Sequence, residues 1–115
     1  MTELGPKDSK YQTNFAKFDA GNGIAHKQEL IVKIVGAETV TGQIRYQNGQ
    51  VCLIDQSHAA DEDQNAETVN FNMKVKGAGT EDYLPPGEYT LICWYWDNET
   101  SRGGSYTDKF LIVGE

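Results

Sequence analysis

The chain has 115 residues, which is the length of one domain, and a formal net charge of −7. Hydrophobic residues make up 38% and charged residues 23%, so a packed core can form and a wholly disordered chain is excluded. The 17 acidic residues against 10 basic ones argue against nucleic acid or an anionic membrane surface as the main partner, because both need a positive face.

Residues 1–28 are polar and irregular. Three aromatic residues stand out there, and the spacing of Tyr11, Phe15 and Phe18 suits successive helical turns. No capping pattern supports a long helix, which leaves a short helix or an arm packed across a sheet. We therefore expect residues 1–28 to be an N-terminal arm that packs on a β-domain formed by residues 29–115.

From residue 29 onward, the apolar residues follow the period of β-strands. Residues 29–35 are rich in β-branched side chains, and residues 68–76 alternate apolar with polar ones, as in an antiparallel strand with one buried face. Residues 89–96 and 106–113 continue the pattern. About seven short strands predict an all-β fold: a single antiparallel β-sandwich, immunoglobulin-like or Greek-key, with a small barrel as the alternative.

One turn is specified by its residues. Asn48 and Gly49 stand between two apolar runs, and an Asn-Gly pair predicts a two-residue type I′ hairpin because both central residues need a positive φ. In that register Tyr46 lies opposite Val51, and Cys52 falls on the polar face. The predicted buried face contains Ile44, Tyr46, Val51 and Leu53.

The two cysteines, Cys52 and Cys93, do not form a disulfide framework or a metal-binding motif. A single bridge is possible, and two reduced thiols are the alternative. No apolar run approaches the ~20 residues that span a membrane. The first residues lack the apolar core of a secretory signal, so the sequence predicts a cytoplasmic protein or a mature secreted form with an added methionine.

The strand from Tyr89 to Trp96 is apolar on both faces towards its C-terminal end. Trp94 and Trp96 share one of those faces. Either they form an exposed platform, or Phe15 and Phe18 of the arm cover them. An exposed indole would stack on the C–H face of a sugar and offer its N–H to a hydroxyl group.

A polar segment, 97–105, follows this strand and predicts a long loop. It brings the side chains of Asp97, Asn98, Glu99 and Arg102 close to Trp96, and such a set suits recognition of a polyol. A solvated turn is the alternative. The order of aromatic strand, polar loop and alternating strand resembles small bacterial calcium-dependent sandwich lectins, but only over the C-terminal segment. The paired asparagine ligands of that family have no match at Gly103-Gly104, so no calcium ligand is carried over.

The acidic segment 55–67 contains a candidate metal site. Asp61, Asp63 and Asn65 match the first half of a calcium loop, whereas Ala66 stands where an EF-hand needs glycine. Since the EF-hand pattern fails, two alternatives are left for this segment: a calcium site of another type, or a solvated acidic loop that favours solubility. Segments 55–67 and 81–99 together hold ten acids and no Lys or Arg, and they would create a local negative field if they shared one end of the sandwich.

Catalysis has little support in the sequence. Asp55, Ser57 and His58 are close along the chain, but a triad must converge in space and no nucleophile-elbow motif is present. No phosphate loop or dinucleotide fingerprint occurs. The sequence thus predicts a non-enzymatic binding module, most simply for carbohydrate, without a cofactor other than a possible calcium ion. The alternative is a protein-binding or self-assembling sandwich, such as an inhibitor, an adhesin or a structural subunit that forms homo-oligomers.

Overall fold

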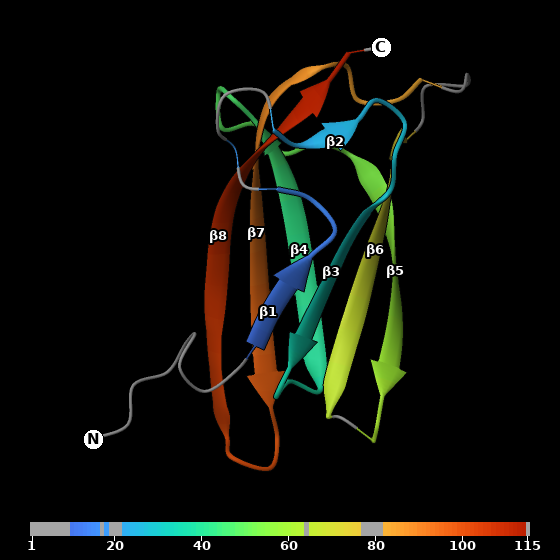
Figure 1. Ribbon diagram of the computed structural model, residues 1–115. Helices are drawn as coiled ribbons and strands as arrows, with labels where there is room; N and C mark the ends of the chain where they lie inside the picture. Colours follow the sequence, from blue (N-terminus) through green and yellow to red (C-terminus); the bar gives the residue numbers. More distant parts are fainter. Residues whose placement is uncertain (1–9, 17, 19–21, 64, 77–81, 115) are drawn as a thin grey trace.

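The described part of the chain forms strands and no helix. The strands build two four-stranded sheets (Figure 1). The computed structural model describes residues 10–16, 18, 22–63, 65–76 and 82–114. The predicted all-β class is confirmed, and the arrangement is compatible with a sandwich. Within the described residues, no helix is long and apolar enough to cross a membrane.

The first sheet has the strand order β1-β3-β6-β5 and is antiparallel throughout. Its strands are β1 (Lys10–Thr13), β3 (Leu30–Val35), β6 (Ala66–Val75) and β5 (Ile54–Asp61). Alternation along β3 and β6 buries every second residue, as the sequence predicts. The buried side chains of these two strands include Leu30, Val32, Ile34, Val69 and Phe71.

The second sheet has the order β2-β8-β7-β4. Its strands are β2 (Ile24–Ala25), β8 (Arg102–Val113), β7 (Gly87–Asp97) and β4 (Thr39–Tyr46). β2 pairs in parallel with β8, and the other pairs are antiparallel. The inner faces of the two sheets share one hydrophobic core, to which this sheet contributes Val40, Ile44, Leu91, Cys93 and Phe110 among others.

The segment expected to form an arm supplies one strand to each sheet, because β1 and β2 both lie within residues 1–28. The ring of Tyr11 stacks on Tyr106 with 4.5 Å between the ring centroids, and Phe15 contacts Phe110 at 5.1 Å. Both contacts join this segment to β8. Tyr11 and Phe15 therefore pack on the inner side of the second sheet.

The predicted Asn48-Gly49 hairpin is wrong by one residue. The Gly49 N–H donates to the Tyr46 carbonyl at 2.9 Å, and the Tyr46 N–H donates to the Gln50 carbonyl at 2.8 Å. The loop therefore has three residues, with Gly49 in the left-handed region at φ 91°. A type I turn followed by a left-handed glycine is a common hairpin solution and uses the same residues.

This shift by one residue reverses which side chains of residues 51–53 face the core. Cys52 becomes buried, whereas Val51 is 37% and Leu53 67% exposed. Side chains alternate between the two faces of a strand, so a slip of one position exchanges the buried and exposed sets. Cys52 and Cys93 are both buried and unbridged.

The free edge of β4 is covered by polar side chains of the first sheet. The amide of Gln56 donates to the Gly42 carbonyl at 2.9 Å and accepts from the Gly42 N–H at 3.3 Å. One residue pair further along, the Val40 N–H donates to the Glu67 carboxylate at 2.9 Å. These bonds satisfy backbone groups that an edge strand would otherwise expose, and they join the two sheets on this side.

The close approach of β4 to the core makes Gly42 a sensitive position. A Cβ atom there would lie 2.6 Å from the Phe71 ring, which is fully buried and cannot move aside. We expect Gly42→Ala to lower the free energy of unfolding by about 1–3 kcal/mol in urea denaturation. The neighbouring, exposed Thr41→Ala should change it by no more than about 0.5 kcal/mol. Equal stability of the two variants would contradict this packing.

Candidate functional site

The outer face of β7 carries two tryptophans, two positions apart. Trp94 is 41% and Trp96 44% exposed, whereas Cys93 and Tyr95 on the opposite face are buried. Since Phe15 lies in the core, it does not cover them. Of the two arrangements that the sequence allows, the exposed one forms. We call Trp94 and Trp96 the indole platform.

The strands on either side leave the indole platform open. Both neighbours of each tryptophan across the sheet are small or carry a hydroxyl group. They are Thr39 and Gly103 beside Trp96, and Thr41 and Ser105 beside Trp94. No long side chain therefore comes from the directly paired positions to cover the rings.

The Trp96 ring is held in one position. A Cβ atom at Gly103 would lie 2.7 Å from Cε3 of Trp96, so the six-membered ring rests where only glycine leaves room. The Trp96 Nε1–H donates to Oδ1 of Asn98 at 2.8 Å, and the Asn98 N–H donates to the Glu38 carboxylate at 2.7 Å. In the described part of the chain, the indole N–H of Trp94 makes no such bond and is available to a ligand.

Asp97 differs from its neighbours because it is only 6% exposed. Its carboxylate accepts from the Thr100 hydroxyl at 2.9 Å and from the Asn65 amide at 3.3 Å. Burial acts to raise the pKa of Asp97, but these bonds and backbone N–H donors outweigh it, and the pKa lies below its usual range. Asp97 therefore organises the turn and does not face solvent with its predicted partners.

The predicted long loop is short. β7 ends at Asp97 and β8 begins at Arg102, and these two residues are paired, so the connection is residues 98–101. Asn98 and Glu99 are exposed, and Arg102 is half-buried. Of the predicted ligand-binding residues, Trp94, Trp96 and Asn98 lie together at the surface. Glu99 faces a separate hollow.

That hollow has a volume of about 300 Å³ and lies where the β3–β4, β5–β6 and β7–β8 connections meet. Four carboxylates line it, and none of its described lining residues is Lys or Arg. We call it the acidic hollow. Its polar lining residues are Glu38, Asp61, Glu62, Asn65 and Glu99.

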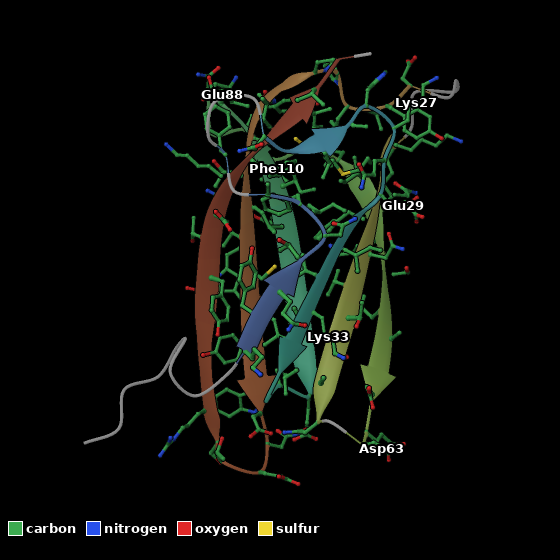
Figure 2. The ribbon with its side chains drawn as sticks, in the orientation of Figure 1. Lys27, Glu29, Lys33, Asp63, Glu88 and Phe110 are labelled. Atoms are coloured by element: carbon green, nitrogen blue, oxygen red, sulfur yellow. The ribbon has the colours of Figure 1, made fainter. Side chains whose placement is uncertain are left out.

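The three predicted metal ligands lie around the β5–β6 turn. Asp63 is exposed at the end of the molecule where these strands join (Figure 2). Asn65 has φ 49° and directs its amide N–H to Asp97. Among the described residues, no group of three or more His, Cys, Asp or Glu side chains is arranged to hold a metal ion.

The acidic residues divide between two ends. Asp63 and the acidic hollow lie at one end, whereas Glu88, near the start of β7, lies at the other (Figure 2). β7 carries the chain from one end of the sheet to the other, so the segment 81–99 cannot stay at a single end. The local negative field is therefore built from residues 61–63, Glu38 and the β7–β8 connection.

His58 and its neighbours in sequence face different partners. His58 Nδ1 lies 3.1 Å from the Glu67 carboxylate, and Asp55 pairs with Lys76 at 3.1 Å. Because side chains alternate along β5, Ser57 and His58 point to opposite faces. The structure thus separates these groups.

Two residues of the site carry little signal in the sequence. Glu38 is far from Asn98 along the chain, and nothing in its neighbourhood points to that contact. Gly103 suggests a loop, because glycine pairs are typical of turns. No protein-family model matches this chain, and no curated protein matches it.

The bond between Trp96 and Asn98 can be tested by spectroscopy. The chain has two tryptophans, so a Trp94→Phe background leaves Trp96 as the only one. In that background we expect Asn98→Ala to weaken the near-ultraviolet circular dichroism of Trp96 and to shift its emission to the red. The cost in unfolding free energy should not exceed about 1.5 kcal/mol. Ser105→Ala, beside Trp94, should leave both spectra unchanged, and an unchanged Asn98→Ala spectrum would contradict the contact.

The lowered pKa of Asp97 gives a second test. The ionised carboxylate stabilises the folded chain at pH values above the unfolded-state pKa of about 3.9, and this contribution is lost as the pH falls through the lower folded-state pKa. Asp97→Asn should therefore unfold at a lower urea concentration than the natural chain at pH 7. The difference should shrink below about pH 4. A gap that stays constant into strong acid would show that the ionised form is not preferred.

Proposed function

We propose that this protein is a non-enzymatic binding module for carbohydrate, and that the glycan lies over the indole platform on the outer face of the second sheet. The observation that carries the proposal is a pair of exposed indoles on one strand, one of them fixed in position by Gly103 and Asn98. Aromatic faces stack on the apolar C–H face of a pyranose ring. A ring fixed before binding loses little rotamer freedom when the ligand arrives.

The residues around the indole platform favour a neutral glycan. Each outward residue of β7 forms a row with its partners on β4 and β8. Counting from Trp96 towards the start of β7, these partners carry hydroxyl, amide or small side chains in the first three rows, and the first charged row is the one that contains Thr90. The rows are Thr39–Trp96–Gly103, Thr41–Trp94–Ser105, Gln43–Ile92–Thr107 and Arg45–Thr90–Lys109. The three uncharged rows extend about 14 Å along β7, which is longer than one sugar ring. The ligand is thus an oligosaccharide chain rather than a single monosaccharide.

Negative charge beside Trp96 disfavours acidic polysaccharides at that end, whereas Arg45 and Lys109 lie at the other end of the face. Glu38 and Glu99 lie at the Trp96 end of the face, and the chain as a whole carries −7. A uronate or sulfate group would meet like charge there. None of the proposed contacts is a metal ligand, so binding does not require calcium.

We also infer that the fold is an immunoglobulin-like, Greek-key type of sandwich. The two strand orders support this. β1-β3-β6-β5 and β8-β7-β4 match the strand orders of the two sheets of such domains, and the short strand β2 is added beside β8. The Tyr89 hydroxyl donates to the Pro85 carbonyl at 2.5 Å at the start of β7, as in a tyrosine corner.

The test is a titration with a panel of soluble glycans. Neutral β-linked glucan, xylan and glucomannan are compared with polygalacturonate by affinity electrophoresis and calorimetry, with calcium and with a chelator. We expect a neutral glycan to bind and Trp94→Ala and Trp96→Ala each to weaken binding at least about tenfold, which is ~1.4 kcal/mol.

Ile31→Ala is the matched control, because Ile31 is an exposed apolar residue on the other sheet, at 37% exposure. It should bind as the natural chain does. If no neutral glycan bound, or if both tryptophan variants kept full affinity, the proposal would be wrong.

A further inference from the structure

The outer edge of β5 is open to solvent. β5 ends the first sheet and pairs only with β6, and it forms the right-hand edge in Figure 1. In the described part of the chain, residues 55–60 make no backbone hydrogen bond outside that pairing. The edge of β4 on the same side is covered by Gln56 and Glu67, so the two edges differ.

The protective features of β5 lie at its two ends, where the register shifts between Ile54 and Gln56 and where Asp55 and Asp61 stand, and the middle of the strand has none. Its central residues, Ser57 to Ala60, are all exposed, and the strand contains no Lys, Arg, Pro or Gly. Natural edge strands are usually shielded by such residues or by a covering loop. The side chains of Ser57, Ala59 and Ala60 are small, so another strand can approach to the ~4.8 Å spacing of a sheet.

The two ends of the edge differ in chemistry. At the Asp61 end lies the acidic hollow, with Ala60 and Asp61 in its wall. At the Ile54 end, Leu53 is 67% and Val51 37% exposed. These two apolar residues also line a hollow of about 170 Å³ beside Gln56. A strand that paired along β5 would thus meet carboxylates at one end and apolar side chains at the other.

We propose that the edge of β5 binds an extended segment of another protein by strand addition. The segment carries Lys or Arg at the end that meets the acidic hollow and an apolar side chain at the end that meets Leu53. Backbone hydrogen bonds supply the affinity, and the two ends set the register. The carboxylates of the hollow suit a basic side chain, because charge-assisted hydrogen bonds to carboxylates are short and strong.

A second copy of this chain fits the edge poorly. A symmetric pair of β5 strands must be antiparallel, which would place Leu53 of one copy against the acidic hollow of the other. Carboxylates would then face apolar side chains, or face each other in neighbouring registers. The edge therefore favours a different protein. The edge of β5 belongs to the first sheet, whereas the indole platform lies on the second.

The test uses the full chain, labelled with ¹⁵N, and synthetic peptides. The probes are Leu-Thr-Val-Thr-Val-Thr-Lys-Lys and its reversed sequence, because the direction of the added strand is open to either choice. Each has a matched peptide with Glu in place of Lys. We expect one lysine peptide to shift the amide signals of residues 54–62 and to slow their hydrogen exchange. The glutamate peptides should bind at least about tenfold more weakly.

Two variants test the geometry. Glu62→Lys should weaken the preference for the lysine peptide, since it replaces one of the four carboxylates of the hollow with a cation. Ala59→Pro should abolish binding by interrupting the edge, and Trp94→Ala should leave it unchanged. The proposal is overturned if neither lysine peptide shifts these signals at ~1 mM, if the shifts fall on β7, or if Glu62→Lys has no effect. A concentration-dependent dimer that protects β5 would also overturn it.

Discussion

The rest of the structure depends on the alternation of side chains along β7. This strand pairs with β4 on one side and with β8 on the other along nearly its whole length. Every second residue from Tyr89 to Tyr95 is buried in the core, so the residues between them must point outward. Because a slip would expose the core residues, the burial of Leu91 and Cys93 is also what keeps Trp94 and Trp96 at the surface.

The indole platform depends both on small neighbouring residues that leave room for the rings and on polar groups that fix the Trp96 ring. Gly103 gives the Trp96 ring a place to lie, and Asn98, itself held by Glu38, fixes the orientation of the ring. Glu38 and Asn98 lie in the connections β3–β4 and β7–β8, and Gly103 lies at the start of β8, so these contacts are at one end of the sheet. The same end holds the acidic hollow, so the two candidate surfaces share Glu38 while facing different directions.

The sequence predicts β3, β4, β6, β7 and β8 and places the two tryptophans on one face, because alternation is a local property. It leaves the exposure of that face open, and it misses β1, β2 and β5. Residues 55–67 are predicted as an acidic loop, whereas Ile54–Asp61 forms a strand. Prediction from sequence fails where a result depends on distant pairing. Asn48-Gly49 is compatible with two loop lengths, and only the burial of Cys52 selects the longer one. Gly103 resembles a loop residue until Trp96 packs over it. Whether Glu99 and Asp61 share one hollow depends on the course of β7 through the sheet, which no local pattern encodes.

The two thiols in the core have a consequence for the chemical durability of the protein. Burial raises the pKa of Cys93 to about 12 and, despite a hydrogen bond with Tyr46, that of Cys52 to about 11. Since the thiolate is the reactive species, both thiols are almost entirely in the unreactive, protonated form at pH 7. Oxidants and alkylating reagents therefore reach these buried thiols only when the two sheets open locally. The rate at which these thiols react is thus a direct measure of how often the core comes apart.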